Sequence, residues 1–317
     1  MSAPFRRAKV RALAKINLGL RVLGRRPDGY HELRTVFQTI SLADTLEIAY
    51  APARRTAIEL EDPLGLPDNL VARAARAAMG AMRATGRVQI RLAKRIPMGA
   101  GLGGGSSDAA AVLLALPVLA GRRLEPARLC EIAGELGSDV PFFLRGGRAV
   151  GIGRGTELFP LPDGAPCGGV LVAPGVTVST AEAYRRLSPR LTIELQQNKI
   201  FSFQSQVWDG DTGTAPVNDF EGVVFEQYPV LARWKKRLIR AQASTVMMTG
   251  SGSALFGLFR TARELSTALA ELGEYTEEEG IYRISLVGRR RYCALWWRAL
   301  EEHITGKVWP PRSRYAQ

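Results

Sequence analysis

The sequence predicts an α+β fold in two parts, and three observations support this expectation. Strand and helix patterns mix along the 317 residues without the steady βαβ alternation that is typical of a parallel sheet. A glycine-rich run at residues 97–107 follows an alternating strand pattern and precedes an Ala/Leu/Val-rich helix. A second glycine-dense stretch, residues 146–155, indicates a hinge. We therefore expect an N-terminal domain over residues 1–160 and a C-terminal domain over residues 161–317.

The overall composition fits a soluble globular protein. Hydrophobic residues make up 46% of the chain and charged residues 23%. Lys and Arg number 43 against 30 Asp and Glu, which gives a net charge of +13. A basic balance favours nucleotides, nucleic acids or membrane surfaces, or reflects only an arginine-rich proteome. Because no dense Lys/Arg tract with interleaved aromatic residues covers a whole face, we expect no nucleic-acid partner.

Cysteine, histidine and hydropathy patterns argue against three further classes. Cys130, Cys167 and Cys293 lie far apart, and their odd number does not suit a disulfide framework. With only two histidines, a zinc site built from Cys and His is not expected. The apolar stretch at residues 109–120 is too short for a membrane span, and the basic N-terminus lacks the apolar core of a signal peptide. We therefore expect a cytoplasmic protein.

The first half begins with a long amphipathic strand. Residues 10–23 alternate, so that apolar side chains share one face while Lys15 and Asn17 point together from the other. After the glycine-rich run, Ser106-Ser107-Asp108 is typical of a helix N-cap, and we expect the following helix to break at Pro117. The other elements expected here are strands over residues 35–41, 45–50 and 88–92 and helices over residues 69–82 and 125–137.

The second half mixes short apolar segments with helices. Residues 191–216 are polar and contain Gln and Gly, which predicts a long surface excursion. The basic tail carries Trp296, Trp297 and Trp309, and we expect an amphipathic helix whose tryptophans pack on the core rather than a membrane or nucleic-acid patch. From Pro310 onward we expect a mobile end. The other elements expected are strands over residues 169–173 and 281–287, helices over 180–187 and 262–272, a helix over 221–241 interrupted near Pro229, and apolar segments around a small-residue loop within 245–259.

The glycine-rich run has the chemistry of an anion site. Glycines let the backbone approach a ligand and turn N–H groups toward it, and the helix N-terminus that follows favours negative charge. A Walker-type phosphate loop would end in Gly-Lys-Ser/Thr, but Gly105 is followed by Ser106-Ser107. Gly99, Gly101 and Gly104 match the dinucleotide-binding pattern formally, yet the acidic residue that should end the next strand is missing. Neither of these folds is favoured.

A third pattern resembles the loop of the galactokinase, homoserine kinase and mevalonate kinase (GHMP) superfamily. The matching residues are Pro97, Gly101-Leu102-Gly103, Ser106-Ser107 and Ala109-Ala110. Further segments, in the same order and spread over nearly the whole chain, resemble one family of this superfamily, the 4-diphosphocytidyl-2-C-methyl-D-erythritol kinases. These segments are Ala14-Lys15-Ile16-Asn17-Leu18, Asp28-Gly29-Tyr30-His31-Glu32-Leu33, Gly137-Ser138-Asp139-Val140-Pro141-Phe142-Phe143, Asn218-Asp219-Phe220-Glu221 and Thr249-Gly250-Ser251-Gly252-Ser253-Ala254.

The resemblance implies a two-lobed GHMP-kinase fold, with a nucleotide lobe like domain 2 of ribosomal protein S5 and a ferredoxin-like C-terminal lobe. It implies an ATP-dependent kinase that phosphorylates the 2-hydroxyl of 4-CDP-2-C-methyl-D-erythritol in non-mevalonate isoprenoid synthesis. Asp139 would take or orient the proton of that hydroxyl, and Lys15 would stabilise charge on the attacking oxygen. Without the resemblance, Asp139 is interpreted as a helix N-cap and Lys15 as a solvated strand lysine.

By the same resemblance, two further sets of residues bind the nucleotide and the acceptor. The implied ATP-binding residues are Asn69, Lys94, Pro97, Met98, Gly99, Ala100, Gly101, Leu102, Gly103, Gly104, Gly105, Ser106 and Ser107. The implied substrate-binding residues are Asn17, Tyr30, His31, Thr180 and Tyr184. The plainer interpretations are a surface charge for Lys94 and a turn histidine for His31. Mg²⁺ is expected beside ATP, with Ser106 or Ser107 as contacts, but the motifs identify no set of metal ligands.

Two other functions stay open on the sequence alone. One is another GHMP small-molecule kinase, of the homoserine or mevalonate type, against which the Tyr30-His31 pair and the Asp139 segment argue. The other is a non-catalytic nucleotide- or RNA-binding module, for which Lys15 and Asp139 would be dispensable. We expect a small-molecule substrate, cytidine diphosphate methylerythritol, and a monomer or a homodimer.

Overall fold

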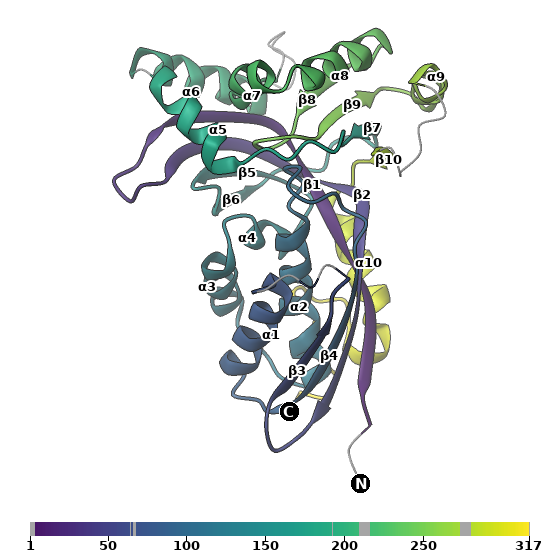
Figure 1. Cartoon of the computed structure of the whole chain (residues 1–317). Coiled ribbons are helices and arrows are strands. Elements are labelled where there is room, and N and C mark those ends of the chain that lie inside the picture. Colours follow the sequence, from purple (N-terminus) through teal and green to yellow (C-terminus); the bar gives the residue numbers. More distant parts are fainter. Residues whose placement is uncertain are drawn as a thin grey trace.

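A long antiparallel strand pair, β1 (Arg6–Arg25) and β2 (His31–Pro52), runs through both lobes of the computed structural model (Figure 1). The structure describes residues 4–63, 65, 68–191, 193–208, 216–272 and 280–316. Along both strands, buried residues alternate with exposed ones in some stretches and follow one another in others, where both faces of the strand are covered. This burial stabilises the strands over their full length. The pair therefore belongs to the first sheet and also packs against the second sheet.

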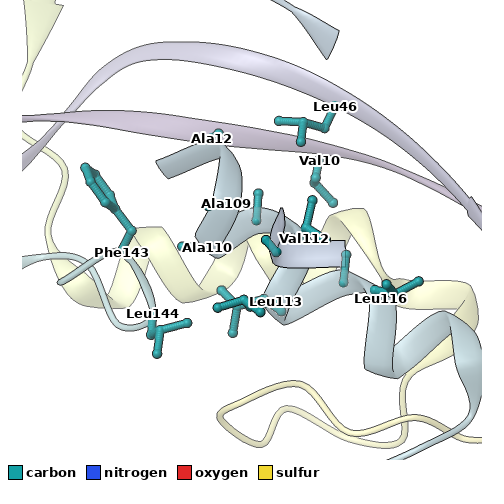
Figure 2. Packing of buried hydrophobic residues seen from close by; sticks show 14 of the residues in the cluster. Val10, Ala12, Leu46, Ala109, Ala110, Val112, Leu113, Leu116, Phe143 and Leu144 are labelled. Atoms are coloured by element: carbon teal, nitrogen blue, oxygen red, sulfur yellow. The ribbon is translucent and has the colours of Figure 1, made fainter. Parts of the chain in front are cut away.

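The first lobe is a six-stranded sheet covered by helices. Its strand order is β3-β4-β2-β5-β6, with β1 also paired to β2, and only β3 and β4 run parallel. The further strands are β3 (Ala57–Glu61), β4 (Gly86–Ala93), β5 (Arg148–Gly153) and β6 (Glu157–Pro160). The helices are α1 (Leu70–Ala81), α2 (Gly104–Ala120), α3 (Pro126–Leu136) and the single turn α4 (Val140–Phe143). Apolar side chains of α2 pack between the strands and α4 (Figure 2).

The second lobe is a four-stranded antiparallel sheet with two covered faces. Its order is β10-β7-β9-β8, formed by β7 (Gly168–Val172), β8 (Thr245–Met248), β9 (Leu255–Phe259) and β10 (Ile281–Ser285). Its helices are α5 (Thr180–Leu187), α7 (Phe220–Gln227), α8 (Pro229–Arg240) and α9 (Ala262–Leu272). Helix α6 (Ile193–Trp208) instead packs Phe203 against Val36 of β2 and Val150 of β5 in the first sheet. One face packs on α7, α8 and α9, and the other packs on the middle of β1 and β2 and on the glycine-rich loop. An apolar core thus joins the two lobes.

The C-terminal segment returns to the first lobe. Helix α10 (Arg289–Ala299) lies beside the first sheet (Figure 1), and Tyr292, Trp296 and Leu300 belong to the first core, with Trp309 packed against it. This confirms for Trp296 and Trp309 the prediction that tryptophans of the tail pack on the core, whereas Trp297 donates to the carbonyl of Val308 within the tail. The predicted mobile end is wrong, because Ser313 is buried and its hydroxyl donates to the carbonyl of Val118 at 2.7 Å.

Three predictions about the first lobe's helix and strands are wrong for packing reasons. Helix α2 continues past Pro117 to Ala120, since it is buried along nearly its whole length and Gly121 ends it in a left-handed conformation. Burial outweighs the one backbone hydrogen bond that proline removes. The N-cap of α2 is Gly103, so the predicted Ser-Ser-Asp cap lies inside the helix. The strands predicted over 35–41 and 45–50 form the single strand β2, which stays paired to β1 through Ala43 and Asp44.

The predicted hinge and the predicted surface excursion are also wrong. Residues 148–153 form β5 inside the first sheet, where a Cβ on Gly151 would lie 2.6 Å from the ring of Phe37. The glycine therefore allows close packing and does not mark a hinge. Residues 193–208 form α6, while 192 and 209–215 lie outside the described residues. The expected lobe boundary at residue 160 coincides with the end of β6 and stays a prediction.

The other elements agree with the sequence patterns to within a few residues. The helices predicted over 69–82, 180–187 and 262–272 correspond to α1, α5 and α9. The interruption near Pro229 separates α7 from α8. Among the helices of the described ranges, none combines the length and the apolar character that a membrane span requires.

Candidate active site

The glycine-rich loop between β4 and α2 passes through two very close contacts. Gly101 and Gly103 have φ angles of 77° and 69°, in the left-handed region that favours glycine. A Cβ on Gly101 would overlap the carbonyl oxygen of Thr249, and one on Gly103 would lie 2.9 Å from the ring of Phe143. The loop is therefore held between the second lobe and α4.

A pocket of about 590 Å³ lies against this loop. Its lining includes Asn69, Lys94 and every residue from Pro97 to Ser106, so the structure brings together all but one of the implied ATP-binding residues. Asn69 caps α1, since its Oδ1 accepts from the Val71 N–H at 2.8 Å while its Nδ2 donates to Asp62 at 2.8 Å. The exception is Ser107.

The two serines at the start of α2 have different surroundings. Ser107 is buried, and its hydroxyl donates to the carbonyl of Leu13 at 2.7 Å. Ser106 is half-buried and lines both this pocket and the larger one described below. Of the two, Ser106 is therefore the one available to a phosphate or a metal ion.

Lys94 is part of a buried charge cluster and not a surface charge. Its ammonium forms ion pairs with Asp44 and, at 2.8 Å, with Asp108, and both carboxylates are buried. Burial alone would lower the pKa of Lys94, but the carboxylates of Asp108 and Asp44 outweigh it and hold that pKa above its ordinary value. Asp44 also accepts from the backbone N–H groups of Arg95 and Ile96 at 2.6 and 2.8 Å. The cluster therefore fixes the start of the loop.

Lys15 and Asp139, 124 residues apart in sequence, meet in the lining of a second pocket. The Lys15 ammonium lies 3.4 Å from Asp139 Oδ2, and Lys15 is only 4% exposed. Asp139 directly precedes α4, yet its side chain makes no capping hydrogen bond. The N-cap interpretation therefore does not account for this carboxylate, which lines the pocket together with Lys15.

Asn17 is buried and fully engaged inside the protein. Its Oδ1 accepts from the Lys15 ammonium at 2.9 Å, from the Thr249 hydroxyl at 3.2 Å and from the Gly250 N–H at 3.0 Å. Its Nδ2 donates to the hydroxyl of Thr35 at 2.7 Å. With 1% exposure, Asn17 is better suited to hold Lys15 than to contact a nucleobase, which was its implied role.

The second pocket has a volume of about 910 Å³ and an aromatic wall. The rings of His31 and Tyr184 stack at 4.4 Å, and His31 Nε2 lies 2.9 Å from the Ser188 hydroxyl. Burial, with Arg25 nearby, lowers the pKa of His31, while burial and the charge of Asp139 raise that of Tyr184. Both rings are therefore uncharged near neutral pH. Tyr30 and Thr180 complete the implied substrate set in this pocket.

Three arginines of this pocket were missed by the sequence motifs. Arg25, Arg154 and Arg185 line it, and the Arg154 guanidinium lies 3.5 Å from the centroid of the Tyr30 ring. Arg25 and Arg185 lie next to segments that the motifs identify. The sequence therefore showed a positive charge near each motif, but it did not show that the side chain points into the pocket. Lys15 is paired with Asp139 in the same pocket and Arg185 with Glu182, so the positive charge of the pocket comes mainly from Arg25 and Arg154.

The two pockets meet at the glycine-rich loop. Gly101, Gly103 and Ser106 line both of them. An anion held by the loop in the smaller pocket therefore lies next to the Lys15–Asp139 pair in the larger one. In the part of the chain that the structure describes, no group of three or more His, Cys, Asp or Glu residues is arranged to hold a metal ion.

Comparison with known proteins agrees with this arrangement. The model of the GHMP kinase N-terminal domain matches residues 69–147, and that of the GHMP kinase C-terminal domain matches residues 209–277. A 4-diphosphocytidyl-2-C-methyl-D-erythritol kinase of Solibacter usitatus is 66% identical over 98% of both chains. One of Pelotomaculum thermopropionicum is 44% identical over 78% of this chain and 87% of its own.

Solved structures give the same result. A crystal structure of 4-(cytidine 5'-diphospho)-2C-methyl-D-erythritol kinase has a TM-score of 0.73 at 38% identity, covering 88% of this chain and 99% of that one. A homoserine kinase of Cytophaga hutchinsonii has a TM-score of 0.69 at 18% identity, which supports the fold alone. The two lobes, together with the glycine-rich loop that lines both pockets, define a GHMP kinase, as the sequence predicted. Within that class, the chain belongs to the 4-diphosphocytidyl-2-C-methyl-D-erythritol kinase family.

Proposed function

We propose that the protein transfers the γ-phosphoryl group of ATP to the 2-hydroxyl of 4-CDP-2-C-methyl-D-erythritol in the non-mevalonate route to isoprenoid precursors. The observation that carries the proposal is the Lys15–Asp139 pair beside the residues that both pockets share. The names of the relatives supply the identity of the acceptor.

ATP would bind in the smaller pocket, with its triphosphate along the glycine-rich loop. The loop leads directly into α2, which begins at Gly104, and the N-terminus of a 17-residue helix attracts negative charge. Glycines at positions 101 and 103 let the loop lie directly against the Thr249 carbonyl and the Phe143 ring, which fixes its path along the pocket. Lys94 supports this geometry by holding the start of the loop.

The cationic, aromatic pocket suits a cytidine diphosphate unit. Flat uncharged rings such as Tyr30, His31 and Tyr184 stack well on a pyrimidine. Guanidinium groups pair with phosphate oxygens in a planar, bidentate manner, and Arg25 and Arg154 offer that chemistry, whereas Arg185 already donates to Glu182. The substrate would then lie with its methylerythritol end toward Asp139.

In the proposed reaction, the substrate hydroxyl oxygen bonds to the γ-phosphorus while the bond to the bridging oxygen of ADP breaks. The hydroxyl proton passes to Asp139, whose carboxylate lies 3.4 Å from the ammonium of Lys15. Lys15 also stabilises the charge on the attacking oxygen, and its burial makes this effect stronger than it would be in water. Asn17 holds the ammonium in place.

The donor groups near the loop fit Mg²⁺ bound mainly through ATP. Mg²⁺ keeps several waters and takes one or two protein ligands beside phosphate oxygens, so it needs no all-protein cage. Ser106 offers a hydroxyl to both pockets, and the buried Oδ1 of Asp108 has no hydrogen-bond partner. When bound, Mg²⁺ would neutralise charge on the β- and γ-phosphates.

An acceptor panel tests the proposal directly. With ATP and Mg²⁺, the purified protein should release ADP with the cytidylated methylerythritol and not with homoserine, mevalonate or galactose. Release of ADP with one of the other acceptors instead would assign a different GHMP activity. No release with any of them, together with ATP binding, would favour a non-catalytic nucleotide-binding module.

The role of Asp139 gives a sharper prediction. Asp139→Asn keeps the size of the side chain but removes the base, so kcat should fall by about 10²–10⁴-fold while the KM for ATP changes little. Steady-state kinetics with both substrates varied measure this. Glu131→Gln, an exposed position on α3, is the matched control and should behave like the wild type. Wild-type turnover of Asp139→Asn would remove Asp139 from the mechanism.

Three properties stay predictions of the sequence. These are a cytoplasmic location, the absence of a nucleic-acid partner, and a monomer or homodimer. Light scattering and a nucleic-acid binding titration would test the last two.

A further inference from the structure

The turn that follows Asp139 ends in two carbonyl groups that no helix continues to satisfy. Helix α4 has only four residues, Val140–Phe143. The last carbonyls of a helix have no partner within it and need donors from elsewhere. Among the backbone hydrogen bonds of the described residues, none goes to the carbonyls of Phe143 or Leu144.

The C-terminal segment supplies both missing donors. The hydroxyl of Tyr292 donates to the carbonyl of Phe143, and the indole Nε1 of Trp309 donates to that of Leu144 at 3.0 Å. The guanidinium of Arg289 donates to the next carbonyls, of Gly146 at 3.3 Å and Arg148 at 2.7 Å. The sequence separations are near 150 residues, so these contacts depend on the return of the chain to the first lobe.

The same contacts are tightly packed. Tyr292 is 2% exposed, and a Cβ on Gly146 would lie 2.6 Å from its ring. The rings of Tyr292 and Trp309 lie 6.0 Å apart, nearly edge to face. Phe143 and Leu144 are seen at the α4 end of the first core in Figure 2. The end of α4 therefore has little freedom to move.

The side chains of α4 reach the surroundings of the catalytic groups through Gly103 and Phe37. The ring of Phe143 lies against Gly103 of the loop. The rings of Phe142 and Phe37 are 5.0 Å apart, and the Lys15 ammonium lies 5.4 Å from the centroid of Phe37. Asp139 itself makes one ion pair among the described contacts, with Lys15, and no capping bond. Its position therefore depends on the backbone of the turn that it precedes.

We propose that Tyr292 and Trp309 are positioning residues, which set the place of Asp139 by holding the C-terminal end of α4. Both lie outside the ranges that the two family models match. The inference rests on the proposed role of Asp139 as the group that takes the substrate proton.

Two conservative variants test it in the full-length protein. Tyr292→Phe and Trp309→Phe each remove one donor and keep an aromatic ring. We expect kcat to fall about 3- to 30-fold, less than the roughly 100-fold that a 1 Å misplacement can cost, with both KM values within twofold of wild type. Trp297→Phe is the matched control, because its Nε1 donates to Val308 within the C-terminal segment and not to α4. It should keep the wild-type kcat.

A double-variant cycle separates positioning from a general loss of structure. Tyr292→Phe added to Asp139→Asn should cause no further loss of kcat, because the residue that it positions is already gone. The same loss in both backgrounds, an equal loss in Trp297→Phe, or unchanged kcat in Tyr292→Phe and Trp309→Phe would overturn the inference alone. Wild-type kcat in Asp139→Asn would overturn the proposed mechanism and this inference together.

Discussion

At the scale of a single residue, two buried carboxylates, Asp108 and Asp44, share one cation, Lys94. This excess of negative charge affects the pKa of Asp108. Burial raises the pKa of Asp108 to about 7, against the opposing charge of Lys94. In the unfolded chain the same group ionises near its ordinary value of 3.8. Between these two pH values the folded state holds the extra proton, so the free energy of unfolding falls as pH rises and levels off above about pH 7.

Asp108→Asn should remove this pH dependence. Its amide keeps the shape and can still accept a hydrogen bond from Lys94. We expect its melting temperature, relative to the wild type, to be higher at pH 8 than at pH 5 by at least about 2 °C, near 1 kcal/mol for a chain of this size. Thermal unfolding at both pH values measures it. Asp68→Asn, at an exposed carboxylate of the same pocket, should show no such change. Equal differences at pH 5 and pH 8 would contradict the assignment.

At the scale of the element, the glycine-rich loop makes opposite predictions for two of its glycines. Gly101→Ala would force a left-handed residue and push a methyl group into the Thr249 carbonyl. We expect a loss of at least about 2 kcal/mol in the free energy of unfolding. Gly105→Ala lies in the first turn of α2, where the nearest atom to a new Cβ is 3.7 Å away. It should be neutral or stabilise by up to about 1 kcal/mol.

Urea unfolding of the two variants side by side decides this. Because both change glycine to alanine, side-chain chemistry cancels and only the backbone and its surroundings differ. If Gly101→Ala unfolds at the wild-type urea concentration, the loop is not held against the second lobe as described.

The elements also indicate what sequence patterns can and cannot predict. Local signals sufficed where neighbouring residues supply the reason, as in the Ala-rich helix α1 or the proline that separates α7 from α8. They failed where distant packing decides. Pro117 does not break α2 because the helix is buried, and Gly151 is small because the ring of Phe37 lies against it. One sequence by itself shows neither the residues that bury α2 nor the contact between Gly151 and Phe37.

The residues of the site likewise fall into those that the sequence identified and those that it did not. Lys15 and Asp139 were found by resemblance, and their 3.4 Å contact agrees with the roles implied for them without testing those roles. Arg154 was missed because no local pattern tells which way a loop arginine points. Trp309 was expected only to pack on the core and Tyr292 was not singled out, since their hydrogen-bond acceptors lie about 150 or more residues away in the sequence.

At the scale of the whole molecule, the two lobes depend on each other. The first core is completed by Val287, Tyr292, Trp296 and Leu300, which come from the last thirty or so residues. A further core joins residues of β1, β2 and the loop to residues of β7, β8, β9 and β10. Cutting the chain between the lobes would therefore expose apolar surface on both sides of the cut.

The fragment of residues 1–160 should not fold alone, although it contains the whole first sheet. It lacks the four core residues from the C-terminal segment and the apolar face of the second sheet. We expect it to aggregate or to melt without a cooperative transition, whereas the full chain should unfold in one transition by both circular dichroism and tryptophan fluorescence. A sharp, reversible melt of the fragment would mean that the first lobe is independent. In that case the C-terminal segment would pack on a core that is already stable without it. Its hydrogen bonds to α4 would then position Asp139 without being needed for the first lobe to fold.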